Sequence, residues 1–411
     1  MSPPRPQSPR ASVALRLLRA SATAAMIALA GCQIVPTPPP AVRPPPPPHA
    51  VYSPASFAAL PGWQDDDQAA AWPALAESCK ALATRPAAWA VWSAVCAAAN
   101  GFDAQDAAAV RSFFETHFTP WRVSGSDGSD SGLVTGYYEP LLSGSWTRSA
   151  TYATPLYAPP EDLLTVDLAE LYPELRGKRV RGRLEGRRVV PYWTRADIDA
   201  GRAALDAKAL VYVTDPVDAF FLQVQGSGRI ELADGSVVRL GYADQNGQPY
   251  RSIARVLIDR GEMTVDQASM QSIREWGVRH PDRLEALLDE NPSYVFFRIL
   301  PPPAPGSLEA QIDGPTGSLG VPLLAQRTVA VDPHAIPLGA PVWLATTQPL
   351  SDRPMQRLVL AQDTGGAIRG PVRADFFWGF GDDAGSKAGR MRQQGRLWLL
   401  WPRGATPPAA N

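Results

Sequence analysis

Two aspartates near the C-terminus have the spacing and surroundings of an acid site. Asp363 ends an apolar run and opens a Gly-rich turn, and Asp375 precedes two phenylalanines in a second apolar run. We expect the two carboxylates to emerge from neighbouring strand ends, beside backbone too small to crowd a ligand. Gly365 and Gly366 of the turn are therefore candidate substrate contacts.

A third carboxylate, Asp332, opens the turn that ends at Gly339. Each of the three aspartates could also be an ordinary turn residue, because Asp before Gly or Pro is common in turns. The set as a whole favours an acid site, since Asp375 lies beside aromatic residues and not in a polar turn. Asp332 remains a candidate substrate contact, although a structural role is favoured for it.

The N-terminus resembles a bacterial lipoprotein signal. Arginines precede the apolar segment Ala20–Ala30, which is too short to span a membrane and runs into the sequence Leu-Ala-Gly-Cys, ending at Cys32. The resemblance to a lipobox implies that residues 1–31 are removed and that Cys32 is acylated, which anchors a protein in a leaflet. Gln33 after the cysteine favours the periplasmic face of the outer membrane. The alternative is an ordinary secretory signal with an incidental cysteine.

Proline dominates residues 35–53 of the following segment, 32–54. Such a sequence favours extended polyproline II geometry, so it is predicted to be a semi-rigid tether; a proline-recognition ligand is the alternative. Beyond it, Cys79 and Cys96 flank an Ala- and Trp-rich stretch with helical spacing. In an oxidising periplasm we predict a disulfide between two helices, worth roughly 3 kcal/mol for a loop of this size.

Composition limits the class of protein. The 411 residues allow two or three domains, and the formal net charge of −1 argues against a nucleic-acid partner. No internal repeat with a solenoid period is present in the sequence. The histidines and cysteines have no metal-ligand spacing, so we predict neither a metal nor a cofactor.

A predicted strand contains the four residues Thr135, Gly136, Tyr137 and Tyr138, after a helical segment over 53–118. Because successive side chains of a strand point to opposite faces, one tyrosine could pack in the core while the other faces a cleft. Sugar rings stack on such aromatic faces, so all four residues are candidate substrate contacts. The alternative is that both tyrosines belong to the core.

Further along, Val211–Arg229 is predicted to be a strand that ends in a Gly-Ser-Gly turn. Gln223 and Gln225 would then share one face, where a row of amides could bind sugar hydroxyls and N-acetyl groups. Gly226 and Ser227 of the turn join the candidate substrate contacts. The alternative is a solvated strand face.

Capping and turn signals indicate the remaining elements. Thr194 and Asp197 have the spacing of a capping box at a helix start. A hairpin, a helix, a pair of helices and a strand are predicted at 230–241, 253–260, 263–289 and 291–298. The final segment, 319–401, is predicted to be all-β, and its short strands punctuated by Gly and Pro are consistent with a closed barrel.

Five ordered motifs resemble the membrane-bound lytic murein transglycosylase A family. They are Val134–Pro140, Phe221–Arg229, Asn291–Arg298, Gly320–Leu323 and Val331–Gly339, and the C-terminal part is similar to the family's three-aspartate domain. The resemblance covers residues 55–403. It implies a mainly β fold with peripheral helices, in which a double-psi β-barrel carries a second β domain as an insertion. Asp375 matches the family's catalytic aspartate and Asp363 its close neighbour, although segment 369–374 is slightly longer than usual.

The resemblance also implies a domain order, with the glycan strand in a groove between the two β domains. The expected parts are a signal peptide (1–31), an anchor and tether (32–54), a helical part with the first barrel strands (55–150), an inserted β-rich substrate-binding domain (151–290), a catalytic barrel (291–403) and a disordered tail (404–411).

The implied activity is that of a peptidoglycan lytic exotransglycosylase, although the motifs alone leave exo or endo cleavage open. One carboxyl group protonates the glycosidic oxygen between N-acetylmuramic acid and N-acetylglucosamine, then accepts the proton of the muramic C6 hydroxyl, which closes on C1. The acid must stay protonated near neutral pH, which aromatic burial or the charge of Asp363 would promote for Asp375. Expected partners are peptidoglycan glycan strands, outer-membrane lipid through Cys32 and other murein enzymes, with the protein itself a monomer.

Two other classes of protein share some of these features. Leu358–Gly366 superficially matches the hydrophobic-Asp-Thr-Gly signature of aspartic proteases, in which two carboxylates share one proton. The other candidate for such a signature, Asp130-Ser-Gly132, follows a polar turn instead of an apolar strand, which disfavours a protease. A non-catalytic glycan-binding lipoprotein could use the same Gln and Tyr side chains, but the retained Asp375 disfavours it.

Overall fold

The computed structural model describes residues 48–175 and 180–408. All of these residues belong to one compact unit. The predicted signal peptide, the acylation site Cys32 and the tether up to residue 47 lie outside the described residues. Within the described ranges, no helix is both long enough and apolar enough to cross a membrane.

Three helices follow the tether, as the 53–118 pattern predicts. They are α1 (Trp72–Ala83), α2 (Pro86–Ala99) and α3 (Ala107–His117). A proline lies in the first turn of α1 and of α2, where its missing N–H removes no helical hydrogen bond. Trp63 and Trp92 are buried in the core.

The last residues of the predicted tether form a strand instead. β1 (Ala50–Pro54) pairs antiparallel with β2 (Phe118–Gly125) along its whole length. Ala50 is buried, and the hydroxyl of Tyr52 donates to the Ala335 carbonyl, so the core holds this segment and the tether prediction was wrong here. At the other end, the predicted tail is held as far as Thr406, whose carbonyl accepts from the Trp401 indole at 2.8 Å.

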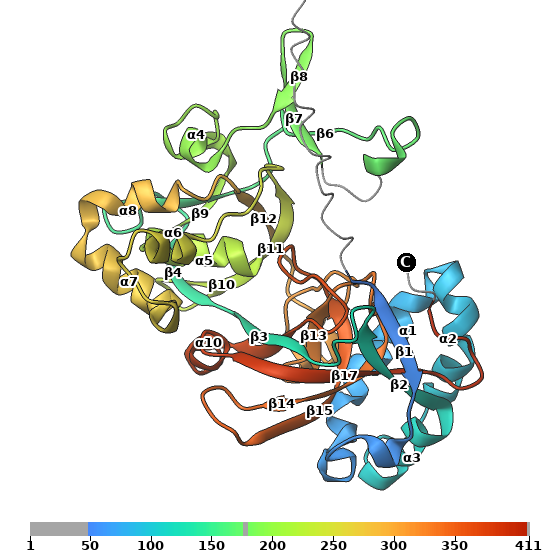
Figure 1. Ribbon diagram of the computed structural model, residues 1–411. Helices are drawn as coiled ribbons and strands as arrows, with labels where there is room; N and C mark the ends of the chain where they lie inside the picture. The colour runs from blue at the N-terminus through green and yellow to red at the C-terminus, as the bar shows by residue number, and fades with distance from the viewer. Residues whose placement is uncertain (1–47, 176–179, 409–411) are drawn as a thin grey trace, which may run out of the picture. The chain divides into compact units, whose positions relative to one another are not determined.

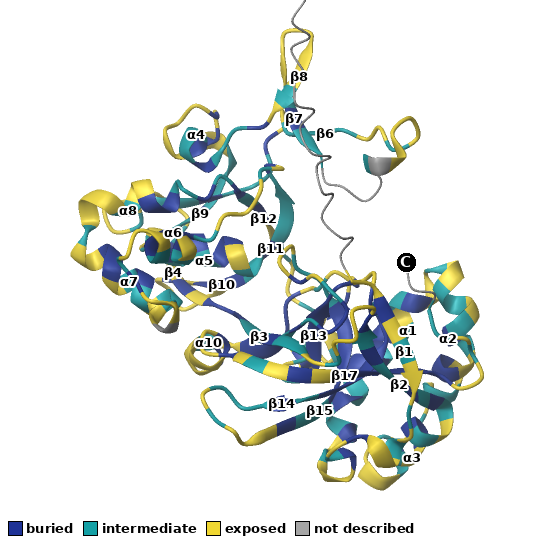
Figure 2. Ribbon diagram, viewed as in Figure 1, coloured by how far each residue is buried: buried dark blue, intermediate teal, exposed yellow. Residues whose placement is uncertain are grey.

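Six strands of the eight-stranded sheet close into a ring of hydrogen-bonded pairs, hereafter the ring. They are β3 (Gly132–Glu139), β13 (Thr328–Val331), β14 (Pro341–Thr347), β15 (Pro354–Asp363), β16 (Ala374–Phe380) and β17 (Arg392–Pro402). Their order is β17-β14-β15-β13-β16-β3, and β3 pairs back onto β17. Strands β13, β14 and β15 are largely buried (Figure 2). The ring therefore brings residues 132–139 into one sheet with the C-terminal strands.

One helix interrupts the predicted all-β segment 319–401. α10 (Gly381–Ala388) contacts β3 and β16. Asp382 and Asp383 lie in its first turn and Lys387 in its last, which complements the helix dipole. Lys387 also pairs with Asp383 one turn earlier at 2.7 Å, so local charge favours a helix that the Gly-rich pattern concealed.

The middle part of the chain, residues 141–300, contains a second sheet of six strands, and helices pack on this sheet (Figure 1). Its order is β12-β11-β10-β4-β9-β5, with bounds β4 (Leu141–Ser145), β5 (Thr154–Tyr157), β9 (Ala209–Val213), β10 (Ser227–Leu232), β11 (Val237–Gln245) and β12 (Val295–Leu300). Because β4 and β12 are members, this sheet begins before residue 151 and ends after residue 290. The expected bounds of the inserted domain therefore cut through the sheet.

The helices of the middle part match their predicted positions, except α5, which lies where a strand was predicted. They are α4 (Arg195–Asp199), α5 (Pro216–Gln225), α6 (Ile253–Asp259), α7 (Met270–Arg279) and α8 (Pro281–Leu288). Thr194 and Asp197 form the predicted capping box of α4. The predicted hairpin is also present as the antiparallel pair β10–β11.

The predicted strand Val211–Arg229 was wrong, because α5 occupies its centre. Asp215 caps the helix by accepting from the Val217 N–H at 2.7 Å, and Pro216 provides a first helical residue with a suitable φ. Gly226 ends the helix with a φ of 82°. A strong local start and stop signal thus outweighed the strand-like apolar run.

A small third sheet of three strands belongs to the middle part. It contains β6 (Leu164–Thr165), β7 (Arg181–Glu185) and β8 (Arg188–Pro191), in that order. Its β7–β8 pair forms a hairpin.

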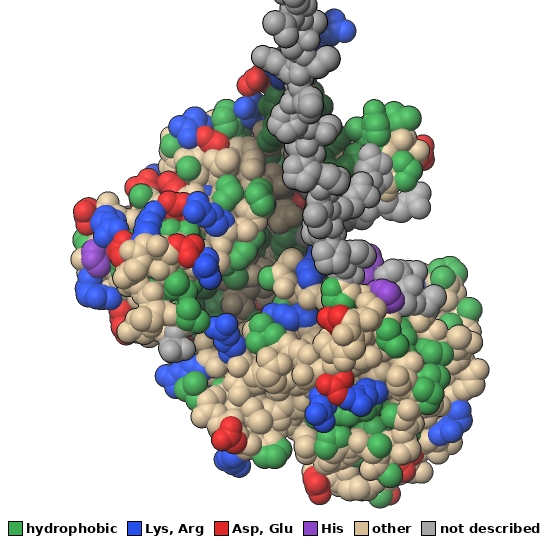
Figure 3. Space-filling view, in the orientation of Figure 1, with side chains coloured by type: hydrophobic (Ala, Val, Ile, Leu, Met, Phe, Trp, Pro, Cys, Tyr) green, Lys and Arg blue, Asp and Glu red, His purple; other side chains and the backbone are tan. Residues whose placement is uncertain are grey.

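Acidic and basic side chains are interspersed over the helical surface of the middle part in Figure 3, and pairs such as Arg260–Glu290 at 2.6 Å account for part of this pattern. Such exposed pairs contribute little to stability.

Candidate active site

One row of paired residues across the ring contains Asp363, Asp375 and Thr135, each from a different strand. Ala330 of β13 pairs with Asp363 on one side and with Asp375 on the other, and Asp375 pairs with Thr135 of β3. Residues opposite one another on neighbouring strands share a face of the sheet. The two aspartates therefore lie on strands separated by β13, and the expectation of neighbouring strands was wrong in this respect.

The carboxyl group of Asp375 is half-buried and hydrogen-bonded through one oxygen. Its Oδ1 accepts from Thr135 Oγ1 at 2.6 Å. Burial raises the pKa of Asp375 to about 6; the Thr135 hydrogen bond and the charge of Arg373 oppose this rise, and the charge of Asp363 adds to it. An appreciable fraction of this side chain is therefore protonated near neutral pH.

The aromatic neighbours of Asp375 divide between two faces. Phe377, two residues on, lies on the Asp375 face beside Tyr137, with ring centroids 5.1 Å apart. Phe376 and Trp378 point to the other face and pack on each other with centroids 5.0 Å apart. Of the aromatic run that follows Asp375, Phe377 is the member that shares its face.

Asp363 is held by donors on both oxygens. Its Oδ1 accepts from Ser318 N at 2.9 Å and from Ser318 Oγ at 2.8 Å, and its Oδ2 accepts from the Tyr137 hydroxyl at 3.1 Å. Burial raises the pKa of Asp363, while these hydrogen bonds lower it. Burial and then the charges of Asp363 and Asp375 raise the pKa of Tyr137, so the phenol remains a donor.

The adjacent tyrosines point to opposite faces of β3, as predicted. Tyr137 faces Asp363, whereas Tyr138 is buried and its hydroxyl lies 3.6 Å from Met270 Sδ. A Cβ added to Gly136 would lie 2.7 Å from Trp378, so this glycine allows β3 to pack closely against that ring. Gly136 and Tyr138 therefore support the fold on the face away from the aspartates.

The predicted row of amides does not exist. Gln223 is buried and accepts from Arg195, and Gln225 accepts from the Tyr138 N–H at 3.3 Å. Residues two apart on a helix do not share a face. Gly226 caps α5 and Ser227 begins β10, so neither joins the row of aspartates.

Asp332 stabilises a turn with both of its oxygens. Oδ1 accepts from His334 N at 3.1 Å and Oδ2 from Gly370 N at 2.8 Å, in line with the structural role favoured for it. Gly365 packs against Ile368, and Gly366 borders open space. Across residues 48–175 and 180–408, no cluster of His, Cys, Asp and Glu side chains is arranged to hold a metal ion.

Ser318 and Arg373 also belong to the site, and neither was a sequence candidate. Arg373 Nη2 donates to Thr135 Oγ1 at 2.8 Å. Residues two apart in a strand share a face, so the position of Arg373 two residues before Asp375 could have indicated that the two side chains lie together. Ser318 had no such signal, because its loop meets Asp363 only through folding.

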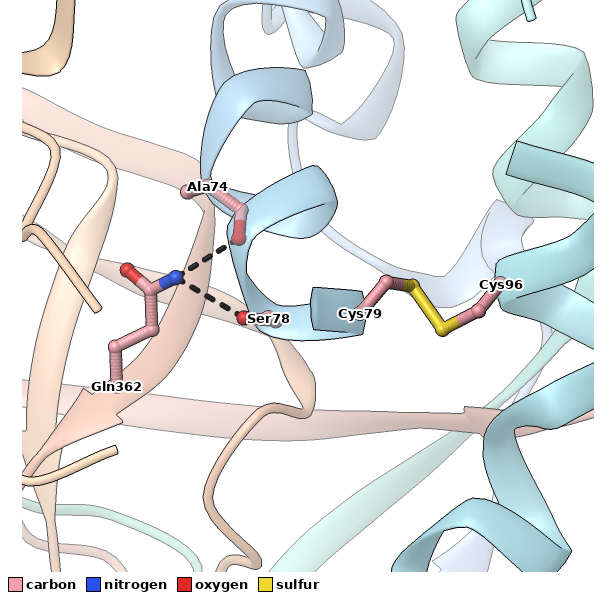
Figure 4. Close-up of a disulfide and its surroundings, with 5 residues drawn as sticks. All are labelled: Ala74, Ser78, Cys79, Cys96 and Gln362. Carbon is pink, nitrogen blue, oxygen red and sulfur yellow. Dashed lines mark hydrogen bonds between the residues drawn. A yellow bond between two sulfur atoms is a disulfide. The ribbon is translucent and has the colours of Figure 1, made fainter. Parts of the chain in front are cut away.

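Helix α1 supports the end of β15 next to Asp363. Gln362 is fully buried, and its Nε2 donates to the Ala74 carbonyl at 2.8 Å and to Ser78 Oγ at 3.0 Å (Figure 4). The next residue of α1, Cys79, is disulfide-bonded to Cys96 of α2, with Cα atoms 5.5 Å apart. The helix pair and the aspartate-bearing strand are thus one connected structure.

A buried ion pair joins β3 to the second sheet. Glu139 is fully buried and accepts from Arg229 Nε at 2.8 Å. Arg229 also pairs with Asp313 at 2.8 Å and lies 4.1 Å from the centre of the Phe380 ring. Burial raises the pKa of Glu139, while the guanidinium of Arg229 opposes that rise.

Two family profiles match the chain. The MltA specific insert domain matches residues 133–298, from β3 through most of β12. The 3D domain matches residues 327–401, which include β13 to β16 and most of β17. The aspartate row therefore combines a strand from the first match with strands from the second.

Curated and solved proteins resemble the chain over most of its length. Membrane-bound lytic murein transglycosylase A of Escherichia coli K12 is 36% identical over 290 residues, covering 68% of each chain. The monoclinic crystal structure of MltA from Neisseria gonorrhoeae has 40% identity and a TM-score of 0.75, covering 87% of this chain and 94% of that chain. E. coli MltA with bound chitohexaose has 30% identity and a TM-score of 0.60, covering 87% and 93%.

Proposed function

The chain belongs to the membrane-bound lytic murein transglycosylase A family, and on this basis we propose that it is a peptidoglycan lytic transglycosylase. The names of its curated relatives support the reaction, and the relative crystallised with chitohexaose supports a glycan strand as the substrate. The bond cleaved is the β-1,4 linkage between N-acetylmuramic acid and N-acetylglucosamine. The products carry 1,6-anhydromuramic ends.

The half-buried Asp375 is the observation that carries this proposal. With its pKa raised to about 6, the side chain can act as an acid and, once ionised, as a base. It protonates the glycosidic oxygen as the bond to C1 breaks. The carboxylate then takes the proton from the muramic C6 hydroxyl, whose oxygen closes on C1, so the enzyme ends in its starting state and no water is consumed.

Asp363 has a different role in this mechanism. Burial raises its pKa, its three hydrogen-bond donors stabilise the ionised form against that rise, and the charge of ionised Asp363 adds to the raised pKa of Asp375. A fixed negative charge in the same row can also stabilise the positive charge that develops at C1. Tyr137 both orients Asp363 and presents a ring beside the acid, so Thr135, Tyr137, Gly365 and Gly366 remain the favoured substrate contacts.

The finer structural assignments follow from the same proposal. The six-stranded ring is the double-psi β-barrel of the catalytic domain, and the second sheet with its helices is the inserted domain that binds the glycan. The name of the relatives and the lipobox-like sequence support anchoring to the periplasmic face of the outer membrane through acylated Cys32. The enzyme acts as a monomer, alongside other murein enzymes.

Mass spectrometry of digested peptidoglycan tests the activity. The full chain is compared with its Asp375→Asn variant, which keeps the shape of the side chain but cannot act as the acid. Products lighter by one water than hydrolytic muropeptides are expected from the wild type. The variant should be slower by ~10²–10⁴-fold, the usual worth of general acid–base catalysis.

Other outcomes separate the competing functions. Equal activity of wild type and Asp375→Asn would move the acid to another residue. Glycan binding without any product from either protein would indicate a binding lipoprotein. Products that retain the water would contradict the non-hydrolytic reaction.

A further inference from the structure

The hydroxyl group of Thr135 lies between an arginine and an aspartate. Arg373 Nη2 is 2.8 Å from Thr135 Oγ1, and Thr135 Oγ1 is 2.6 Å from Asp375 Oδ1. A guanidinium carries only donors, so Thr135 must accept from Arg373. The single hydroxyl hydrogen is then directed to Asp375 Oδ1.

Arg373 is itself held in place by the two strands that carry its partners. Its Nη1 donates to the Leu133 carbonyl of β3 at 3.2 Å and to the Ala374 carbonyl of β16. The side chain is half-buried. A planar group with several donors in fixed directions can fix a neighbouring hydroxyl more precisely than a flexible ammonium can.

This arrangement distinguishes the two oxygens of Asp375. Oδ1 is an acceptor whenever the Thr135 hydroxyl keeps its direction. A proton on the carboxyl group must therefore sit on Oδ2, since a proton on Oδ1 would meet the hydroxyl hydrogen.

We propose that Arg373 is a positioning residue, which acts through Thr135 to hold the transferable proton of the acid on Asp375 Oδ2. The proposal rests on the proposed function, in which Asp375 is the acid and base. Oδ2 gives its proton to the glycosidic oxygen and later receives one proton from the C6 hydroxyl, so the carboxyl group is restored. Oδ1 keeps its hydrogen bond throughout and fixes the orientation of the group.

The charged and titratable groups around Asp375 determine what loss of this contact would do. Arg373 stabilises the ionised carboxylate with its charge, Thr135 does so with its hydrogen bond, and the charge of Asp363 acts in the opposite direction. The phenol of Tyr137 faces the same carboxylates. Removal of Arg373 or of the Thr135 hydroxyl therefore raises the pKa of Asp375 above that in the wild type.

Four variants of the full chain test this contact. Arg373→Met removes the donor and the charge, and Thr135→Val removes the hydroxyl with little change of shape. Thr135→Ser restores the hydroxyl, and Arg373→Lys restores the charge without the planar fork. Arg369→Met is the matched control, because Arg369 is an exposed arginine of the same loop.

Two measurements are made on each variant. In the first, carbon-13 NMR follows the titration of the Asp375 carboxyl carbon, assigned by its loss in Asp375→Asn. In the second, kcat and KM for soluble glycan strands are measured against pH. The wild type serves in both as the reference for the proposed function.

We expect Arg373→Met and Thr135→Val to titrate at higher pH than the wild type. Their kcat at the optimum should fall by ~10–100-fold with little change in KM, because a misplaced catalytic group costs up to about 10²-fold. Activity requires the protonated acid, so the alkaline limb of their kcat profiles moves to higher pH. Arg369→Met should behave as the wild type. Thr135→Ser should bring the titration of Asp375 and the alkaline limb back towards their wild-type positions, and Arg373→Lys should be intermediate.

An unchanged titration in both Arg373→Met and Thr135→Val would overturn the inference. So would a loss of kcat with no movement of the alkaline limb, since this would indicate a purely structural role for Arg373. A wild type that makes no anhydro product would contradict the proposed function. The NMR titration would still decide whether Arg373 directs the Thr135 hydroxyl to Asp375.

Discussion

Asp363 and Asp375 lie on opposite sides of β13, and each is paired with the same residue, Ala330. Only one methyl side chain separates them within the row, so each carboxylate can influence the charge of the other. Burial raises the pKa of both side chains, but three donors oppose the rise at Asp363, whereas Asp375 accepts from one donor and has a pKa raised to about 6. The environments of two similar side chains thus assign them different roles.

The pH dependence of the wild type should reflect the protonated acid. We expect kcat/KM on glycan strands to fall as the pH rises through about 6, the raised pKa of Asp375. The residual activity of Asp375→Asn should lack this limb. A steady-state profile from pH 4 to 9 measures both, and a limb shared by the two proteins would contradict the assignment of the acid.

Asp363→Asn should move the alkaline limb of the pH profile to lower pH, whereas Arg373→Met should move it to higher pH. The change removes a negative charge that raises the pKa of Asp375, so the acid loses its proton at lower pH. Activity at pH 7 should fall by roughly 10-fold or more, since less protonated acid remains and the charge in the row is lost. The Asn oxygen can still accept from Ser318, and an unaltered alkaline limb would show that the two carboxylates are not coupled.

Asp375→Asn should stabilise the protein at neutral pH while reducing its activity. The folded pKa of Asp375 is raised above the usual value of 3.8, so the folded state holds the proton more tightly than the unfolded chain. That stabilisation is complete below pH 3.8 and is lost as the pH rises through about 6. Above this range the neutral variant should gain on the order of 1 kcal/mol in urea unfolding, after allowance for solvent screening. A gain that persists undiminished at pH 4 would contradict the charge explanation.

Arg229→Met should destabilise the connection between the ring and the second sheet. It leaves the fully buried Glu139 without its cationic partner, and removal of one member of a buried pair typically costs about 3–5 kcal/mol. Thermal unfolding of Arg229→Met is compared with that of Lys208→Met, which breaks the exposed pair with Glu161. The control should be nearly unchanged, and adding Glu139→Gln to Arg229→Met should recover part of the loss. Equal effects of the buried and exposed changes would refute the prediction.

The double variant Cys79→Ser/Cys96→Ser should lower the free energy of unfolding by roughly 3 kcal/mol, the typical contribution of a disulfide that closes a loop of this size. The bond connects α1 with α2, and α1 binds Gln362 beside Asp363. Chemical denaturation with and without reductant measures the change. Reductant should destabilise the wild type but not the variant, and an equal response of both would point to another cause.

Features encoded within a few residues could be predicted from the chain alone. Short-range geometry determines three such features: the capping box at Thr194, the hairpin β10–β11 and the opposite faces of Tyr137 and Tyr138. Where two local signals compete, the prediction failed. The apolar run after Val211 resembles a strand, but the Asp215 cap and Pro216 favour a helix, which separates Gln223 from Gln225 and removes the amide row.

The amino-acid sequence was sufficient to identify the family, because this depends on residue type and on motif order, and it predicted Asp363 and Asp375 as the candidate acid pair. The arrangement of the site required the folded chain. β13 lies between the two aspartate strands, and Thr135 and Arg373, 238 positions apart, meet at Asp375. Such contacts arise when distant strands close into the ring, and no local pattern of side chains encodes which strands become neighbours.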